Sequence, residues 1–293
     1  MLRHQPVLAQ ETFENLPQKV ELYFDGTFGH GGHCEYFLTH LPEEKAKKMR
    51  VLACDIDAEV QKKGLEFTKA RSSQITPILS SYAKIDTISE KYGKIDFMLL
   101  DLGVNMEHFK DGERGFSIKY DAPLDMRFNR ENPISAETII NSYSLEKLSD
   151  LFSLYGDFSP KSAQYFAKGI IEARGKKKIT TTWELKEILF NLKCNQKKIA
   201  VLFQALRIET NKELEQLHQF LAKFGECLTL WGRCAIMTYH SIEDRITKLA
   251  FKELEDSQRF QLVNKKVIKP YYLEVEKNKA ARSAKLRIIE RIA

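Results

Sequence analysis

The sequence predicts an α/β fold in which a Rossmann-like, doubly wound parallel sheet is interrupted by a helical insertion. Three observations support this prediction. Short apolar runs alternate with helix-compatible stretches over the first hundred residues, and three of these runs end in an aspartate. Residues 132–198 then carry only helix signals. Apolar strands separated by helices are typical of a parallel sheet that is covered on both faces.

Four apolar runs are the predicted strands of the first half. They comprise residues 20–24, 51–54, 75–79 and 95–100. A helix is expected over residues 59–70, between the second run and the third. Asp25, Asp55 and Asp101 directly follow the first, second and fourth runs, so their side chains are expected at the carboxyl ends of the strands.

Capping signals mark the helical insertion. Ser144 and Ser159 can cap helices, the second with Pro160 at its first position, and Thr181 with Glu184 forms a capping-box pattern. We expect the insertion to span residues 126–204, within a sheet domain of residues 1–125 and 205–293.

The remaining elements return the chain to the sheet. We expect a long helical region over residues 214–230 and then a strand over residues 234–239. Residues 260–267 and 284–292 are expected to form a terminal strand pair.

Composition favours a polyanionic partner without requiring one. The net charge is +6, and the basic excess is concentrated in two segments. Basic residues outnumber acidic ones by 13 to 8 over residues 127–204 and by 10 to 3 over residues 259–293. Phosphate contacts would need such a concentration, although the run at residues 174–178 is equally compatible with a solvated loop.

The cysteines and the chain start indicate a cytoplasmic protein. The five cysteines are scattered without a CxxC pair, which predicts reduced thiols and neither a disulfide framework nor a zinc site. No signal peptide and no apolar run long enough for a membrane span are present, so no membrane partner is expected. Nothing in the sequence indicates an oligomeric state.

A glycine-rich turn follows the first predicted strand. Residues 25–33 read DGTFGHGGH, and glycines there let the backbone turn sharply and approach a ligand beside a helix start. The spacing is not GxGxxG, which disfavours a nicotinamide-dependent oxidoreductase, and no Gly-Lys-Ser/Thr follows. A tight turn without a ligand is the alternative.

Two aspartates favour a bound ligand over a simple turn. Asp55 lies at a strand end 23 residues after Gly32, where a carboxylate binds ribose hydroxyls in doubly wound folds. Capping of the next helix is the alternative for Asp55, and we assign that role to Asp57. Asp101, at the end of the fourth strand, points to the same crevice and could accept hydrogen bonds from a substrate amine.

Eight motifs in this order resemble the ribosomal RNA small subunit methyltransferase H family, nearly end to end. They are residues 4–8 (HQPVL) with Glu11, 25–33 (DGTFGHGGH), 101–104 (DLGV), 113–117 (ERGFS), 121–127 (DAPLDMR), 203–208 (FQALRI) with Asn211 and Glu213-Leu214, 240–245 (HSIEDR), and 281–287 (ARSAKLR).

The resemblance implies a class I methyltransferase fold with S-adenosylmethionine as methyl donor and no metal. It implies transfer to the N4 amine of a cytidine in the decoding region of 16S rRNA, within the small ribosomal subunit. Carried over by motif, the donor-binding residues are Gly31, Gly32, His33, Asp55, Tyr82 and Asp101, with Asp101 beside the reacting groups. The helical insertion is the expected RNA-substrate domain.

The chain departs from the family in three places. Asn105-Met106-Glu107-His108 replaces Ser-Ser-x-Gln, which makes His108 the candidate for a donor contact. Tyr82 stands where the family has Phe. Residues 278–282 read NKAAR instead of NPRAR, so a bidentate phosphate contact is lost while the charge remains.

Three further residues have two interpretations each. His240 follows the resumed strand and is a candidate general base, with a structural or RNA-contacting role as the alternative. Arg127 and Arg207 are candidates for RNA or substrate-loop contacts and equally for structural salt bridges.

Two rival functions are considered. A methyltransferase for another acceptor, such as C5 of cytosine, would need a nucleophilic cysteine, and none lies near Asp101 or His240 in the sequence. A non-catalytic RNA-binding assembly factor would keep the basic surfaces without binding the donor.

Overall fold

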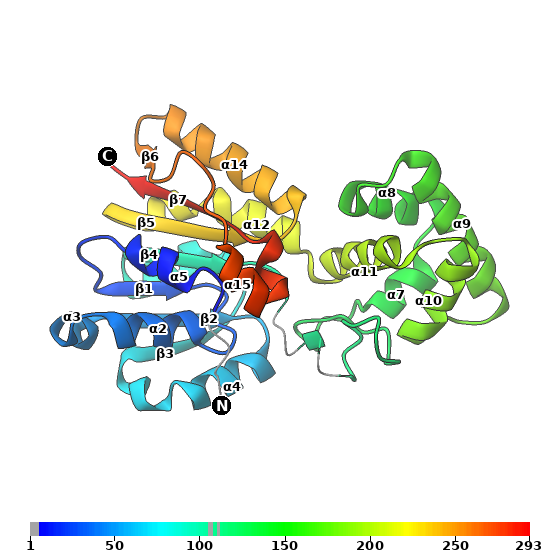
Figure 1. Cartoon of the computed structure of the whole chain (residues 1–293), viewed down its shortest axis with the longest axis horizontal. Coiled ribbons are helices and arrows are strands. Elements are labelled where there is room, and N and C mark those ends of the chain that lie inside the picture. Colours follow the sequence, from blue (N-terminus) through cyan, green and yellow to red (C-terminus); the bar gives the residue numbers. More distant parts are fainter. Residues whose placement is uncertain (1–5, 105–107, 110–111) are drawn as a thin grey trace. The chain divides into compact units, whose positions relative to one another are not determined.

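The structure is a computed structural model that describes residues 6–104, 108–109 and 112–293 (Figure 1). The chain divides into two units, one of Met1–Gly103 with Glu215–Ala293 and one of Val104–Leu214. His4, Gln5 and the Asn105–Glu107 part of the departure from the family lie outside the described residues.

The first unit is built on one seven-stranded sheet. Its strands follow the order β3-β2-β1-β4-β5-β7-β6. Strands β1 to β5 pair in parallel, and β7 is antiparallel to both β5 and β6. The bounds are β1 Leu22–Asp25, β2 Arg50–Asp55, β3 Ile75–Leu79, β4 Ile95–Asp101, β5 Leu228–Thr238, β6 Phe260–Leu262 and β7 Lys285–Arg291. The predicted α/β class and the terminal strand pair are confirmed.

Alternating side chains of the sheet enter two separate cores. Tyr23, Phe97 and Leu99 pack on one side with α2 (Gly32–His40). Phe24 and Met98 pack on the other side with α5 (Ile85–Tyr92), α12 (Glu213–Leu221), α13 (Phe224–Cys227) and α14 (Ser241–Asp256). A strand that is apolar on both faces requires this two-sided cover, since each face must be removed from water.

Apart from α1, which precedes β1, the helices of this unit lie between successive strands along the chain (Figure 1). They are α1 Ala9–Glu14, α2 Gly32–His40, α3 Glu43–Lys48, α4 Ala58–Phe67, α5 Ile85–Tyr92, α12 Glu213–Leu221, α13 Phe224–Cys227, α14 Ser241–Asp256 and α15 Tyr272–Lys277. Among the described residues of this unit, three short 3-10 helices join them: η1 Lys69–Gln74, η2 Tyr82–Lys84 and η3 Lys279–Ser283.

The helical region expected over residues 214–230 is confirmed as far as residue 227, and it is wrong for residues 228–230, which are strand. The chain forms α12, the short α13 and then β5, which begins at Leu228. Trp231 has a positive φ of 66° and the pairing of β4 with β5 shifts register near Ile95, so the start of β5 is irregular. The apolar residues at the start of β5 are compatible with a helix as well as a strand, and their pairing with β4 stabilises the strand. Similarly, β6 ends at Leu262 instead of residue 267.

The second unit is helical and has its own core. Its helices are α7 Ala136–Ser142, α8 Leu145–Gly156, α9 Pro160–Lys176, α10 Thr182–Asn191 and α11 Gln196–Asn211. Ser144, Ser159 and Thr181 cap α8, α9 and α10 as predicted, the last in a capping box with Glu184. Buried Leu148, Phe152, Phe166 and Leu202 form the centre of the core.

This unit is longer at both ends than the expected insertion, residues 126–204. At the first end, Leu124 N donates to Thr180 O and Thr182 N to Ala122 O, both at 2.9 Å, so residues 122–124 belong with the helices. At the second end, α11 continues without a break to Asn211. The expected domain boundaries at 125 and 205 therefore fall inside Val104–Leu214.

All five cysteines are buried and free. Among the described residues, no helix combines the length and the apolar character that a membrane span needs.

Candidate active site at the carboxyl ends of the strands

The predicted site residues of the first unit gather where the order of the strands reverses. Between β1 and β4 the chain switches from one side of the sheet to the other, and Asp25 and Asp101 end these two adjacent strands. Gly26 N donates to Leu99 O at 2.9 Å, which joins the glycine-rich turn to β4. Ligands of open α/β sheets bind at such a switch point, beyond the carboxyl ends of the strands.

The glycine-rich turn is closely packed against its surroundings. Gly31 has a φ of 72°, and a Cβ there would lie 2.7 Å from Thr68 Cγ2. A Cβ on Gly26 would lie 2.3 Å from Leu100 Cδ2. The turn therefore requires glycine at both positions, which brings bare backbone to the mouth of the site, and α2 begins at Gly32 directly after it.

Asp55 ends β2 and faces this turn. Its Oδ2 accepts a hydrogen bond from Gly29 N at 2.7 Å, and its Oδ1 accepts one from Asp57 N at 2.9 Å. Burial raises the pKa of the Asp55 carboxyl to about 7, against the opposing effect of these two hydrogen bonds. Asp57 caps α4, as predicted, by accepting from Glu59 N and Val60 N.

Asp101 is held by three neighbours from separate elements. Its Oδ1 accepts a hydrogen bond from the Tyr239 hydroxyl at 2.7 Å, and its backbone N donates to Thr27 Oγ1 at 2.6 Å. Its Oδ2 lies 3.6 Å from His33 Nε2. The Asp101 side chain is 27% exposed, so one oxygen is fixed by Tyr239 while the carboxylate remains open to a ligand.

Asp25 is a buried acid directly beside this group. Its Oδ2 accepts from the Tyr23 hydroxyl at 2.7 Å and its Oδ1 from Thr27 N at 3.3 Å. Burial raises the pKa of Asp25 to about 6, partly opposed by the nearby His33. Sequence reasoning identified Asp25 only as a strand end, and it did not identify Thr27 or Tyr239 as site residues.

His33 is buried on α2, and neither of its ring nitrogens has a hydrogen-bond partner among the described residues. Buried polar groups without partners are costly, so this side chain suits a site that is completed by a ligand. The backbone of the turn, the Asp55 carboxylate and the His33 ring together fit a ligand that contains a nucleoside and an additional polar group.

Tyr82 and His108 occupy different units. Tyr82 begins η2, packs its ring edge-on against Phe220 at 5.8 Å between centroids, and lies beside the glycine-rich turn near Gly26. His108 lies in the helical unit, where its ring stacks on Phe116 with a centroid distance of 4.7 Å. The predicted donor contact of His108 stays a prediction.

The structure gives His240 a capping role. It is the N-cap of α14, and Glu243 Oε2 accepts from the backbone N of both Tyr239 and His240. His240 Nε2 lies 3.0 Å from Glu243 Oε1, so its ring contacts Glu243 rather than Asp101. This matches the structural alternative, and the role as general base stays a prediction.

Arg127 and Arg207 form structural salt bridges. Arg127 binds Asp125 through two hydrogen bonds of 2.8 Å, and its pKa is raised by them. Arg207 binds Glu213 in the same way at 2.7 and 3.0 Å. Both guanidinium groups are therefore engaged inside the helical unit.

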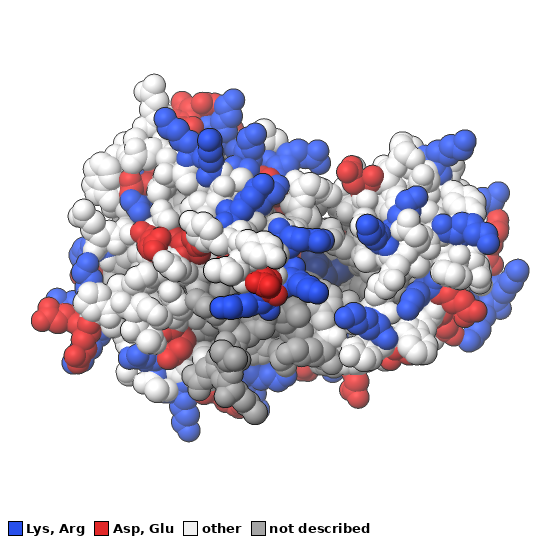
Figure 2. Space-filling view, viewed as in Figure 1, with Lys and Arg blue, Asp and Glu red and all other residues white. Residues whose placement is uncertain are grey.

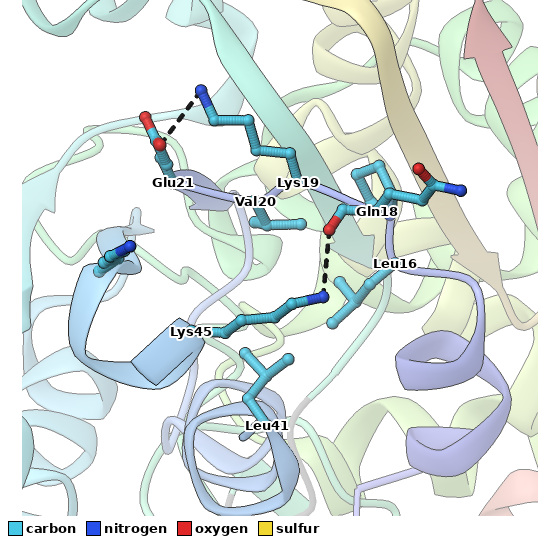
Figure 3. A pocket seen from close by; sticks show the side chains of 9 residues that line it. Leu16, Gln18, Lys19, Val20, Glu21, Leu41 and Lys45 are labelled. Carbon is cyan, nitrogen blue, oxygen red and sulfur yellow. Dashed lines mark hydrogen bonds and ion pairs between the residues drawn. The ribbon is translucent and has the colours of Figure 1, made fainter. Parts of the chain in front are cut away.

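A separate cavity of about 240 Å³ lies at the amino ends of β1 and β2, whereas Asp25, Asp55 and Asp101 lie at the carboxyl ends of their strands (Figure 3). Two lysines that line it are engaged: Lys45 donates to Gln18 O at 3.3 Å, and Lys19 pairs with Glu21 at 3.1 Å.

Among residues 6–104, 108–109 and 112–293, no cluster of His, Cys, Asp and Glu is suited to hold a metal ion.

Comparison with known proteins gives matches over the whole chain. The family model described as MraW methylase family matches residues 1–292. The ribosomal RNA small subunit methyltransferase H of Coprothermobacter proteolyticus is 37% identical, over 99% of this chain and 96% of that protein. The protein of the same name from Elusimicrobium minutum is 38% identical, over 99% and 98%. Among solved structures, an rRNA methylase from Streptococcus thermophilus aligns over 100% of this chain and 99% of its own with a TM-score of 0.45 and 10% identity.

Proposed function

Since the chain belongs to the MraW methylase family, we propose that it transfers a methyl group from S-adenosylmethionine to the N4 amine of a cytidine in the decoding region of 16S rRNA. The observation that carries the proposal is the group formed by Asp101, Tyr239 and His33 beside the glycine-rich turn. A cytoplasmic location, with the small ribosomal subunit as the partner, is part of the proposal.

The residues at the carboxyl ends of the strands fit the donor. Gly31 and Gly32 offer bare backbone, His33 offers its ring Nδ1, which has no hydrogen-bond partner among the described residues, for the methionine part, and Asp55 offers two carboxylate oxygens for the ribose hydroxyls. Tyr82 lies beside the turn, on the side proposed for the adenine. When bound, S-adenosylmethionine supplies an electrophilic methyl group on a sulfonium.

Asp101 is the proposed catalytic residue. The exocyclic amine of cytosine is a weak nucleophile because its lone pair is delocalised into the ring, so orientation of that amine is the main task of the protein. Asp101 Oδ2 can accept a hydrogen bond from the amine, since Tyr239 already occupies Oδ1. The amine must lose a proton on methylation, and Oδ2, with His33 Nε2 at 3.6 Å, is placed to receive it.

The helical unit is the proposed RNA-substrate domain. It contains a cavity of about 540 Å³ whose lining includes the rings of Phe109, Phe116, Tyr120 and Phe203 and the cation of Lys119. Aromatic rings and cations are the groups that bind unstacked bases and phosphates. A cytosine in structured RNA has to leave its stack before an enzyme can methylate its amine.

The test is mass spectrometry of nucleosides after incubation of the protein with labelled S-adenosylmethionine and unmodified small ribosomal subunits. Labelled N4-methylcytidine is the expected product. Asp101→Ala should abolish it with the fold preserved, whereas Asp256→Ala, which removes an exposed acid at the end of α14, should not change it.

Three other results of this test would contradict the proposal. Donor binding without any labelled nucleoside would indicate another acceptor, and near-normal turnover in Asp101→Ala would contradict the placement of the active site. Absence of donor binding in calorimetry would favour the non-catalytic assembly factor.

A further inference from the structure

An exposed aromatic pair lies at the start of α15. Tyr271 and Tyr272 are 75% and 77% exposed, and the neighbouring Leu273 is 66% exposed. Aromatic side chains usually bury most of their area, so two adjacent tyrosines in solvent need an explanation. Within the part of the chain that the structure describes, neither tyrosine side chain has a hydrogen bond or a ring contact.

Basic side chains surround this pair. The segment of residues 265–282 carries six exposed cations, and Figure 2 shows Lys and Arg side chains around the position that α15 has in Figure 1. The six are Lys265, Lys266, Lys269, Lys277, Lys279 and Arg282. Within the described part of the chain none of the six is in an ion pair, whereas Lys285 and Arg287 just beyond them both bind Asp244.

The segment is fixed beside the candidate active site. Glu274 on α15 accepts a hydrogen bond from Leu8 N at 2.9 Å, and the chain just before Leu8 packs on the donor-binding turn, where Pro6 Cβ lies 3.4 Å from the Cβ position of Gly32. Glu274 is also among the charges that raise the pKa of Tyr239, the residue that holds Asp101. These contacts all lie within the sheet unit, so they place α15 next to the methyl-transfer site itself.

We propose that Tyr271 and Tyr272, with the unpaired cations around them, form a platform for single-stranded RNA next to the reacting cytidine. Successive bases stack on exposed aromatic rings independently of sequence, and lysines bind the phosphates between them. The charge of this surface favours RNA over a second copy of the chain as its partner. In a symmetric contact between two copies, the unpaired cations of one copy would face the same cations of the other. This inference rests on the proposed function, because it takes RNA to be the methyl acceptor.

The test is fluorescence anisotropy with a fluorescein-labelled single-stranded RNA of twelve nucleotides. Tyr271→Ala/Tyr272→Ala should raise the Kd at least about fivefold, the effect of one lost stacked base. Tyr271→Phe/Tyr272→Phe should stay within about twofold of wild type, because stacking needs the ring and not the hydroxyl. Tyr271→Leu/Tyr272→Leu keeps apolar bulk without a ring and should lose affinity as the alanine pair does. The same loss in both variants would show that the missing rings, rather than misfolding of the alanine pair, lower the affinity.

Matched changes control for charge and for exposure. Lys269→Gln/Lys277→Gln should reduce the slope of log Kd against log salt by roughly 0.7 for each lost phosphate contact. Leu249→Ala removes an apolar side chain of α14 that is 61% exposed, and it should leave the Kd unchanged.

Methyl transfer to small subunits separates this inference from the proposed function. The alanine pair should raise the KM for subunits with kcat and donor affinity unchanged. Unchanged Kd and KM in an active enzyme would overturn the platform while the proposed function stands. If the alanine pair loses RNA affinity but the wild-type protein methylates no RNA, the platform stands and the proposed function is overturned. A change in sedimentation mass with RNA affinity intact would show that the surface joins two copies, which also overturns the platform.

Discussion

Removal of the Tyr239 hydroxyl tests the active-site geometry most directly. In Tyr239→Phe the ring remains, next to Gly103, and only the 2.7 Å hydrogen bond to Asp101 Oδ1 is lost. Asp101 then keeps its backbone bond to Thr27 but can rotate its carboxylate. We expect slower methyl transfer with unchanged donor affinity, because Asp55, the proposed ribose ligand, and the glycine-rich turn are untouched.

The size of the effect follows from the type of bond. A hydrogen bond to a charged group contributes about 1.5–3 kcal/mol net. Asp101 is 27% exposed, so water can replace part of the lost bond and the lower end of that range applies. At about 1.4 kcal/mol for each factor of ten, kcat should fall about tenfold. Burial and Asp101 hold the pKa of Tyr239 well above its usual range, so the hydroxyl stays a donor and the defect should be the same from pH 6 to pH 9.

Single-turnover methyl transfer to small subunits, with calorimetry for the donor, measures both quantities. Tyr143→Phe is the matched control, since it removes a tyrosine hydroxyl from Glu209 at the same distance of 2.7 Å in the helical unit. We expect its rate of transfer to equal that of wild type. A Tyr239→Phe enzyme with kcat within twofold of wild type would refute the role of Tyr239 in positioning Asp101.

Two further predictions concern the donor site and the helical unit. The affinity for S-adenosylmethionine should rise about tenfold from pH 6 to pH 8, since Asp55, with a pKa of about 7, must lose its proton before both oxygens can accept ribose hydroxyls. Calorimetry across this range checks it; a flat profile would contradict it, and Asp55→Asn should bind weakly at every pH. Thr181→Ala removes the capping box of α10 and should lower the free energy of unfolding by about 1 kcal/mol in urea titrations. Ser142→Ala, which loses a bond of 2.6 Å to Thr138 O near the end of α7, should cost less, and equal losses would argue against the cap.

Local signals predicted much of the fold. The strand β3 matches residues 75–79, and three helix caps were predicted from their residue types because a cap depends on neighbours within one turn. The aspartates at the strand ends were placed correctly, since parallel strands bring their carboxyl ends to one edge. The family resemblance of the eight motifs is confirmed by the match over residues 1–292.

The missed features depend on distant contacts. Tyr239 and Asp101 are separated by 138 residues, and only the pairing of β4 with β5 brings them together. The start of β5 at Leu228 was taken for helix because a short apolar run fits both periods. Arg127 and Arg207 had two interpretations, and the geometry of Asp125 and Glu213 favours the structural one.

The acids of the proposed site suggest how it would bind the donor and release the product. The charge of Asp101 contributes to the raised pKa of Asp25, and the charge of Asp25 adds to the raised pKa of Asp55. Such a cluster is unfavourable on its own, because burial and like charges both oppose the charged forms. A cationic sulfonium relieves this repulsion, whereas the neutral thioether left after transfer does not. If the donor binds at the proposed site, the same carboxyl groups that lower the stability of the empty site favour the donor over its product.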